Sequence, residues 1–229
     1  MTAFGNALRK AERRGLGQEA ADRIRDAIFG GVFPPGAVLR EVELAAGLEV
    51  SRGSVREALA QLEQEGLVRS AWHRGTRVID LSVADVDEVY AVRAALERLA
   101  ATSAGRRVDG EALAALEDLV SEMDSALRAG AAGSDLLALD IAFHDRIYAA
   151  AGNRRLLDAW HAVRSQVYLF QLTRVARDDA DYRSILVEEH RELLALLRAG
   201  DTPRLAEAAE EHVDSARRRL VRMLAAAES

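Results

Sequence analysis

Apolar residues recur three and four positions apart along most of this chain, which is the spacing of one buried helix face. In the first third, the pattern predicts a helix that ends at Gly30 and a short helix over residues 41–46. Ser51 can cap a third helix, which extends to about residue 65. Two short helices joined by a tight turn are typical of a helix-turn-helix.

Two strand-like runs follow the third helix. The runs 67–69 and 76–79 are short and rich in Leu, Val and Ile, and the segment 72–75 between them predicts a hairpin with a basic tip. We therefore expect a wing beside the helix-turn-helix.

From residue 82 onward the pattern is helical. Glycine and aspartate breaks separate six amphipathic segments, which predict an antiparallel helical bundle. These helices are expected over residues 85–104, 110–129, 134–151, 154–177, 181–199 and 202–225. The fold class is therefore mainly α, with an N-terminal winged helix-turn-helix followed by an all-α antiparallel bundle of six helices. The predicted parts are an N-terminal arm (1–17), a winged helix-turn-helix domain (18–80), a linker (81–84) and a helical domain (85–225).

Length and composition agree with this division. A chain of 229 residues with 49% hydrophobic and 30% charged residues can form two folded domains. No apolar run reaches the roughly 18 residues that span a bilayer, and the N-terminus lacks the apolar stretch of a signal peptide, so we expect a cytoplasmic protein without a membrane partner. Because there is no cysteine, any metal must be held by histidine and carboxylate side chains.

Charge is unevenly distributed along the chain. Residues 1–77 carry 12 basic and 10 acidic residues, a net charge of +2, whereas the remainder carries 19 and 27, a net charge of −8. The N-terminal third is therefore the part that can face nucleic acid, although a net charge of +2 is a weak signal.

The third helix has two arginines at the end that a helix-turn-helix inserts into the major groove. Arg52 and Arg56 are four residues apart and project from one face, where each can contact guanine or a phosphate. Ser51 can place backbone donors on a phosphate. The alternative is that these arginines form an ordinary solvated face.

Further basic residues flank the predicted recognition helix. Arg40 precedes the second helix and can contact the DNA backbone, while Arg74 at the wing tip can enter the minor groove beside Gly75. Arg40, Ser51, Arg52, Arg56, Arg74 and Gly75 are thus the predicted DNA contacts.

The sequence over residues 23–78 resembles the DNA-binding domain of the GntR family of transcription regulators. That resemblance implies DNA contacts from Arg40, Arg52, Arg56 and the Arg74-Gly75 tip. Glu49 departs from the family pattern, which usually has a turn glycine there, and Gly53-Ser54 replaces a frequent Thr-Pro. The matching residues are Ile24-Arg25-Asp26-Ala27-Ile28, Gly31, Pro35-Gly36, Leu39-Arg40-Glu41, Leu44-Ala45, Val50-Ser51-Arg52, Val55-Arg56-Glu57-Ala58-Leu59, Leu62, Glu65-Gly66-Leu67-Val68 and Arg74-Gly75.

Three histidines in the helical domain occupy positions where a helix would bury aliphatic side chains. His144, His190 and His212 each lie on an apolar stripe, and Asp140 lies four residues before His144 on the same face. A single buried histidine is usually a core residue. Burying an aspartate is costly, however, and a divalent cation would neutralise it while using the imidazoles as ligands.

We therefore predict that Asp140, His144, His190 and His212 converge on a divalent metal ion, zinc in the first place, with nickel, manganese or iron as alternatives. The region 85–222 resembles the FCD effector domain of the FadR branch of the GntR family. Metal-binding members of that branch carry one Asp and three His in this order.

A metal held by one carboxylate and three imidazoles keeps a positive charge and open positions, which predicts a small organic acid as effector. Arg93 lies on the apolar stripe of the domain's first helix, where a charge needs an anionic partner. The alternative partner is Glu97 in an internal ion pair. Arg164 is a second candidate contact, and His73 and His161 are expected at the surface or in packing.

Taken with the resemblance, these features predict a homodimeric repressor that binds a two-fold related operator and responds to a small carboxylate. One alternative is a metal that is purely structural or is itself the signal. Another is a His/Asp metalloenzyme, which is disfavoured because the metal motif lacks an additional acid or base. We therefore predict that the protein is not an enzyme.

Overall fold

The structure is a computed structural model that describes residues 14–71, 75–177 and 180–227. The chain divides after Asp80 into two units, and buried apolar side chains form a core in each. The two units are described separately below.

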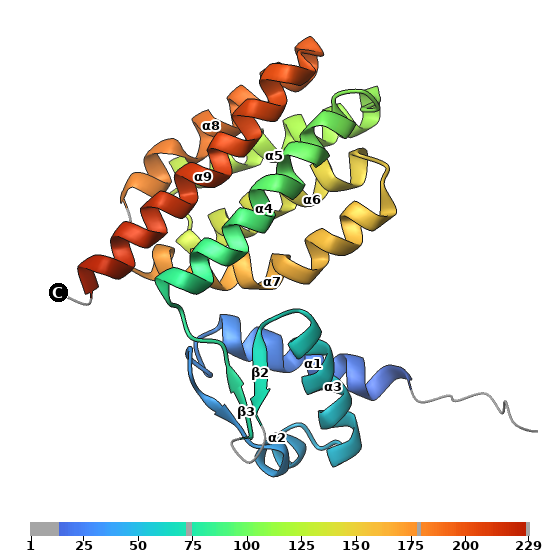
Figure 1. Ribbon diagram of the computed structural model, residues 1–229, viewed down its shortest axis with the longest axis vertical. Coiled ribbons are helices and arrows are strands. Elements are labelled where there is room, and N and C mark those ends of the chain that lie inside the picture. The colour runs from blue at the N-terminus through green and yellow to red at the C-terminus, as the bar shows by residue number, and fades with distance from the viewer. Residues whose placement is uncertain (1–13, 72–74, 178–179, 228–229) are drawn as a thin grey trace, which may run out of the picture. The chain divides into compact units, whose positions relative to one another are not determined.

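In its described part, the N-terminal unit contains three helices and a three-stranded antiparallel sheet (Figure 1). The helices are α1 (Arg14–Phe29), α2 (Glu41–Gly47) and α3 (Arg52–Gln64). The strands are β1 (Val38–Leu39), β2 (Val68–Ala71) and β3 (Gly75–Val78), with β3 in the middle. Val68 pairs with Val78, and both side chains are buried, so the hairpin register follows the apolar pattern.

Helix α1 packs against α3 in this unit. Ile24 and Ile28 of α1 and Leu62 of α3 are buried in the shared core. At the end of α3, Arg25 donates to both carboxylate oxygens of Glu65, at 2.8 and 2.6 Å. This pairing fixes α1 against the end of α3.

The turn between α2 and α3 includes a residue in the left-handed region. Glu49 has a φ of 55° and is the only non-glycine residue with positive φ in the described part of the chain. Glycine adopts this conformation without a steric cost. Ser51 then begins α3 as expected, because its Oγ accepts a hydrogen bond from the backbone N–H of Ser54 at 3.1 Å.

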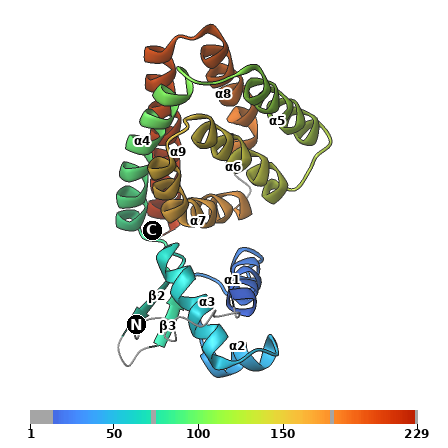
Figure 2. The ribbon, with the colours of Figure 1, turned by 90° about the vertical axis from the view of Figure 1, so that its right-hand side faces the viewer.

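The described part of the C-terminal unit contains six helices and no strand (Figures 1 and 2). They are α4 (Val83–Ala104), α5 (Gly110–Arg128), α6 (Gly133–Ala150), α7 (Arg154–Ala176), α8 (Ala180–Ala199) and α9 (Thr202–Ala227). Helices α4 and α9 lie side by side, and α6 and α7 also pack against α4.

The core of the C-terminal unit is apolar but encloses charged groups. Leu116, Phe143 and Trp160 are among its fully buried side chains. Arg93 and Glu97 of α4 are buried as well. A buried charge is costly unless it is paired, so these groups mark the part of the core that is not purely apolar.

The predicted fold class is confirmed, since a winged helix-turn-helix is followed by a six-helix unit. Strand β1 was not predicted, because a two-residue strand after Pro35 and Gly36 shows no alternation. Helix α1 begins at Arg14, so residues 14–17 are helical although we expected them in the arm.

Candidate metal centre and nucleic-acid interface

The N-terminal half of α3 presents two arginine side chains to solvent. Arg52 and Arg56 are 57% and 61% exposed, and both contact the same atom of α2. Oε2 of Glu41 lies 3.3 Å from Nη2 of Arg52 and 2.9 Å from Nε of Arg56. Arg40, just before α2, pairs with Glu43 at 3.0 Å. The predicted DNA-contacting arginines of this region are therefore exposed and are paired with the first turn of α2.

The wing is present, and one of its two predicted contacts can be described. Gly75 begins β3 with a φ of 72°, a conformation that favours glycine. Arg74 lies outside the described residues, as do Trp72 and His73. The predicted minor-groove contact of Arg74 stays a prediction.

Four side chains from three helices converge inside the C-terminal unit. Asp140 and His144 from α6, His190 from α8 and His212 from α9 each bring one ligand atom within 4.8 Å of the others. Oδ1 of Asp140 lies 3.3 Å from Nε2 of His144 and 3.2 Å from Nε2 of His190. The Nε2 atoms of His144 and His212 are 3.3 Å apart. Two ligands bonded to one metal at about 2.0–2.1 Å lie roughly 3 Å apart, so this spacing fits a single ion.

The other nitrogen of each imidazole faces an acceptor. Nδ1 of His144 lies 2.6 Å from Oε1 of Glu97, and Nδ1 of His212 lies 2.8 Å from Oε2 of Glu189. Nδ1 of His190 lies 2.7 Å from the carbonyl oxygen of Leu186. Because ionised carboxylates and carbonyls only accept, each Nδ1 carries a proton and donates it, and each ring directs its Nε2 atom into the cluster.

Asp140 completes the ligand set. The Tyr182 hydroxyl donates to its Oδ2 at 3.2 Å, which orients the carboxylate. Oδ1 of Asp140 and Nε2 of His190 are both buried. Neither atom has a hydrogen-bond partner among the described residues. A buried polar atom without a partner is costly, and a cation would satisfy both atoms.

The electrostatics of the cluster are dominated by carboxylates. Burial lowers the pKa of His144, but Glu97 and Asp140 outweigh this effect and raise it to about 9. Burial raises the pKa of Glu97, whereas His144 and Arg93 lower it to about 2. The pKa of Asp140 lies well below its usual range despite burial, because of His144 and His190. Both carboxylates are therefore ionised at neutral pH.

Two buried guanidinium groups lie beside the cluster. Arg93 is 2% exposed, and its Nε lies 3.8 Å from Oε2 of Glu97, so the expected alternative partner is present. Arg174 of α7 is also buried, with its guanidinium 5.2 Å from the centre of the Tyr182 ring. Arg93 and Arg174 line a cavity of about 20 Å³ together with Asp140 and two of the histidines.

The structure does not bring Arg164 to this cavity. Its guanidinium pairs with Asp145 at 2.7 Å and is 34% exposed. His161 is exposed on α7, as expected for a surface residue. Arg174 was not predicted from sequence, because an arginine near the end of a helix is normally solvated.

Two family models match this chain. The model described as bacterial regulatory proteins, gntR family, matches residues 16–78, and the model described as FCD domain matches residues 88–215. The second match alone covers more than half of the chain. The chain belongs to the GntR family.

Relatives of this GntR protein align with most of its length. It is 34% identical to the probable D-xylose utilization operon transcriptional repressor of Paenarthrobacter nicotinovorans, over 89% of this chain and 88% of the relative. It is 30% identical to the HTH-type transcriptional regulator YdhC of Bacillus subtilis, over 84% and 83%. The crystal structure of a GntR regulator from Rhodococcus sp. RHA1 superposes with a TM-score of 0.71 at 25% identity, covering 90% of this chain and 97% of that one.

Membership of the GntR family establishes a DNA-binding transcription regulator and not an enzyme, in agreement with the prediction. Within the described residues, every helix is too short or too polar to cross a membrane.

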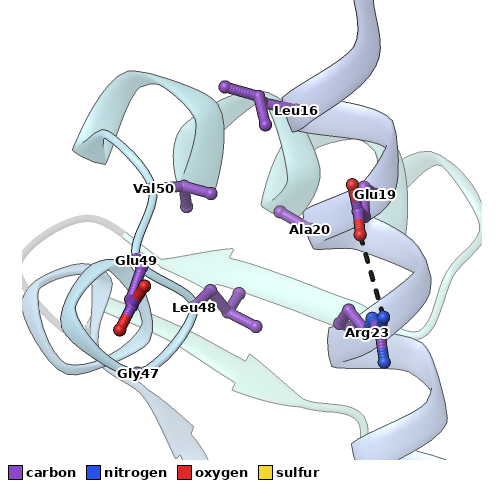
Figure 3. Close-up of a pocket in the computed structure, with 8 residues that line it drawn as sticks. All are labelled: Leu16, Glu19, Ala20, Arg23, Gly47, Leu48, Glu49 and Val50. Carbon is purple, nitrogen blue, oxygen red and sulfur yellow. Dashed lines mark ion pairs between the residues drawn. The ribbon is translucent and has the colours of Figure 1, made fainter.

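The N-terminal unit of this GntR protein has a larger groove, which contains none of the predicted contacts. Figure 3 shows α1 on one side and the α2–α3 turn on the other. The groove has a volume of about 480 Å³, and its ion pair, Glu19 with Arg23 at 3.8 Å, is largely exposed. It is lined by Leu16, Glu19, Ala20, Arg23, Gly47, Leu48, Glu49 and Val50.

Proposed function

We propose that this GntR regulator is a homodimeric repressor whose operator affinity is controlled by a small organic acid bound at a metal in the FCD domain. The observation that carries the proposal is the direction of the cluster's ligand atoms. Three imidazole Nε2 atoms and one aspartate oxygen lie within 4.8 Å of one another, while the Nδ1 atoms are engaged elsewhere.

The donor set fits a divalent transition metal. Imidazole and carboxylate ligands suit zinc, and also nickel, manganese and iron. Asp140, His144, His190 and His212 would hold the ion, and Glu97, Glu189 and Tyr182 would orient three of these ligands. When bound, the metal supplies a Lewis-acidic site for a carboxylate oxygen.

The charges around the cluster favour an anionic effector. Arg93 and Arg174 balance the carboxylates of Glu97 and Asp140, and the partly exposed Glu189 offsets one charge of a divalent ion. A net positive charge then remains, which one organic carboxylate neutralises. A purely structural metal also explains the ligands, but it leaves this net positive charge without an anion to neutralise it.

The cavity also indicates how binding can act on the protein. A volume of about 20 Å³ holds roughly one water molecule, so an organic acid has to displace side chains that line it. Arg174 and Tyr182 are two such side chains. The groove of the N-terminal unit is roomier, yet its charged pair is exposed, so we place the effector in the FCD domain.

On the DNA side, Arg52 and Arg56 would contact bases or phosphates in the major groove, with Arg40 on the backbone and Ser51 at the helix N-terminus. Gly75 would allow the wing tip, including Arg74, to approach the minor groove. One short recognition helix supplies few base contacts, which supports a dimer on a two-fold related operator. Repression is supported by the name of the Paenarthrobacter relative.

Metal and effector can be tested together. His190→Ala and His212→Ala should lower the metal content measured by elemental analysis and abolish the effect of organic acids on operator affinity. His161→Ala, a change of the same kind at an exposed position of α7, should leave both unchanged. Metal-free wild-type protein that binds its organic acid at full affinity would contradict the proposal.

The DNA contacts need a separate experiment. Arg52→Ala and Arg56→Ala should each weaken binding to a selected operator by about 1–3 kcal/mol where the contact is bidentate to a base. Footprints identical to that of wild type would show that the recognition helix has been misplaced. A monomer that binds a single half-site tightly at physiological salt would refute the dimer.

A further inference from the structure

Helix α2 carries an acidic side chain at its first position, in direct contact with the predicted recognition arginines. Oε2 of Glu41 accepts from Arg56 Nε at 2.9 Å and from Arg52 Nη2 at 3.3 Å. A single carboxylate oxygen thus connects two cations that are one turn apart on α3. The Glu41 side chain is 33% exposed, less than either arginine.

The contact leaves each guanidinium able to bind DNA. An arginine has five N–H donors. Arg56 uses Nε, which leaves both Nη groups, and Arg52 uses Nη2, which leaves Nε and Nη1. Glu41 can therefore remain in place while both arginines contact bases or phosphates.

The contact also limits how the arginines can move. Exposed arginine side chains lose rotamer freedom when they bind, and a side chain already held in one orientation loses less. Two cations four residues apart on a helix repel each other, and a carboxylate between them offsets that repulsion. Although burial opposes ionisation, hydrogen bonds from Arg56 and Arg52 lower the pKa of Glu41, so the carboxylate is charged at neutral pH.

The same negative charge acts against binding that depends only on phosphates. Binding to DNA of arbitrary sequence is driven by neutralisation of phosphates. A carboxylate in contact with two arginines lowers the positive potential that such DNA encounters. The fixed orientation of the arginines raises the affinity for the operator, whereas the reduced positive charge lowers the affinity for other DNA.

We infer that Glu41 is a specificity-determining residue, which orients Arg52 and Arg56 for the operator and weakens their attraction for other DNA. The inference rests on the proposed DNA contacts of these two arginines.

The test is the conservative variant Glu41→Gln in the full-length protein. Operator duplexes are first selected from a random pool with wild-type protein, and binding is then compared with a shuffled duplex at several salt concentrations. We expect Glu41→Gln to bind the shuffled duplex more tightly and the operator more weakly, so that the ratio of the two affinities falls roughly tenfold.

Glu49→Gln is the matched control. It removes the same charge from the turn before α3, where Glu49 is exposed and contacts neither arginine in the described part of the chain. This variant should bind both duplexes slightly more tightly, with an unchanged ratio. Far-UV circular dichroism and thermal unfolding establish that both variants are folded.

Equal affinity ratios in Glu41→Gln and Glu49→Gln would overturn the inference and leave the proposed DNA contacts standing. An Arg56→Ala variant with wild-type operator affinity would overturn the proposed contact of Arg56 and this inference together. A ratio that falls only in Glu41→Gln supports it.

Discussion

The Nδ1 atom of His144 lies 2.6 Å from the Oε1 atom of Glu97, and both side chains are buried although they come from different helices. The second carboxylate oxygen accepts from the Tyr148 hydroxyl at 3.1 Å. Both carboxylate oxygens of Glu97 are therefore hydrogen-bonded. Through one of them Glu97 orients the His144 ring, whose Nε2 faces the cluster. This arrangement makes Glu97 a positioning residue for a proposed metal ligand.

Replacing Glu97 should weaken metal binding without removing a ligand. Glu97→Gln leaves the shape of the side chain but removes the charge that holds the His144 ring, so zinc affinity should fall by about 10–100-fold. Competition with a chelating dye measures this change. Glu88→Gln, at an exposed position of the same helix, should bind zinc like wild type. Equal affinities for the two variants would remove Glu97 from the site.

Metal affinity should rise with pH. In the metal-free protein, Glu97 and Asp140 raise the pKa of His144 to about 9 against the effect of burial. The metal must displace the proton on Nε2 of His144, and the fraction of rings that carry this proton rises as the pH falls toward and below the pKa. Zinc affinity should therefore increase about tenfold per pH unit up to about pH 9 and then level off. Zinc titrations across this range provide the measurement, and a flat profile would show that His144 does not exchange a proton for the metal.

The same substitution at Arg93 and at Arg164 can show which of these two predicted residues contacts the effector. Arg93→Gln should keep its metal but bind an organic acid at least about tenfold more weakly, because a charge-assisted hydrogen bond is lost. Arg164→Gln should bind like wild type, since Arg164 pairs with Asp145. Calorimetry and metal analysis report the two properties separately. Normal binding by Arg93→Gln with weak binding by Arg164→Gln would move the effector contact to Arg164.

The α2–α3 turn should become more stable with glycine. Glu49 has a φ of 55°, and the left-handed region costs a residue with a Cβ about 1–2 kcal/mol. Part of this gain is lost to the greater freedom of glycine in the unfolded chain, so Glu49→Gly should stabilise the N-terminal unit by about 0.5–1 kcal/mol. Chemical denaturation followed by circular dichroism measures the change. A destabilised Glu49→Gly would show that the glutamate side chain makes a stabilising contact.

Much of the Asp/His cluster could be predicted because the sequence places polar residues on apolar stripes. His190 shares its stripe with Leu186 and Leu193, and the structure buries all three. Asp140 and His144 are four residues apart, which puts them on one face of α6. Helical periodicity is local, so it is visible in a single sequence.

The residues around the cluster could not be found in the same way. Glu97 was considered only as a partner of Arg93 on its own helix, and its contact with His144 spans two helices. Arg174 and Glu189 resemble ordinary solvated residues near polar neighbours, and only the packing of α7 and α8 brings them to the cavity. Contacts between helices depend on crossing geometry, which periodicity does not specify.

The small cavity beside Arg93 and Arg174 would limit the speed of the proposed response to an organic acid. A space of about 20 Å³ is closed to an organic acid until lining side chains move. When such an opening precedes binding, the observed association rate stops rising with ligand concentration and reaches the opening rate. Once the association rate equals the opening rate, additional effector would not make the regulator respond sooner. The delay before transcription changes would then be set by the opening rate of the FCD domain.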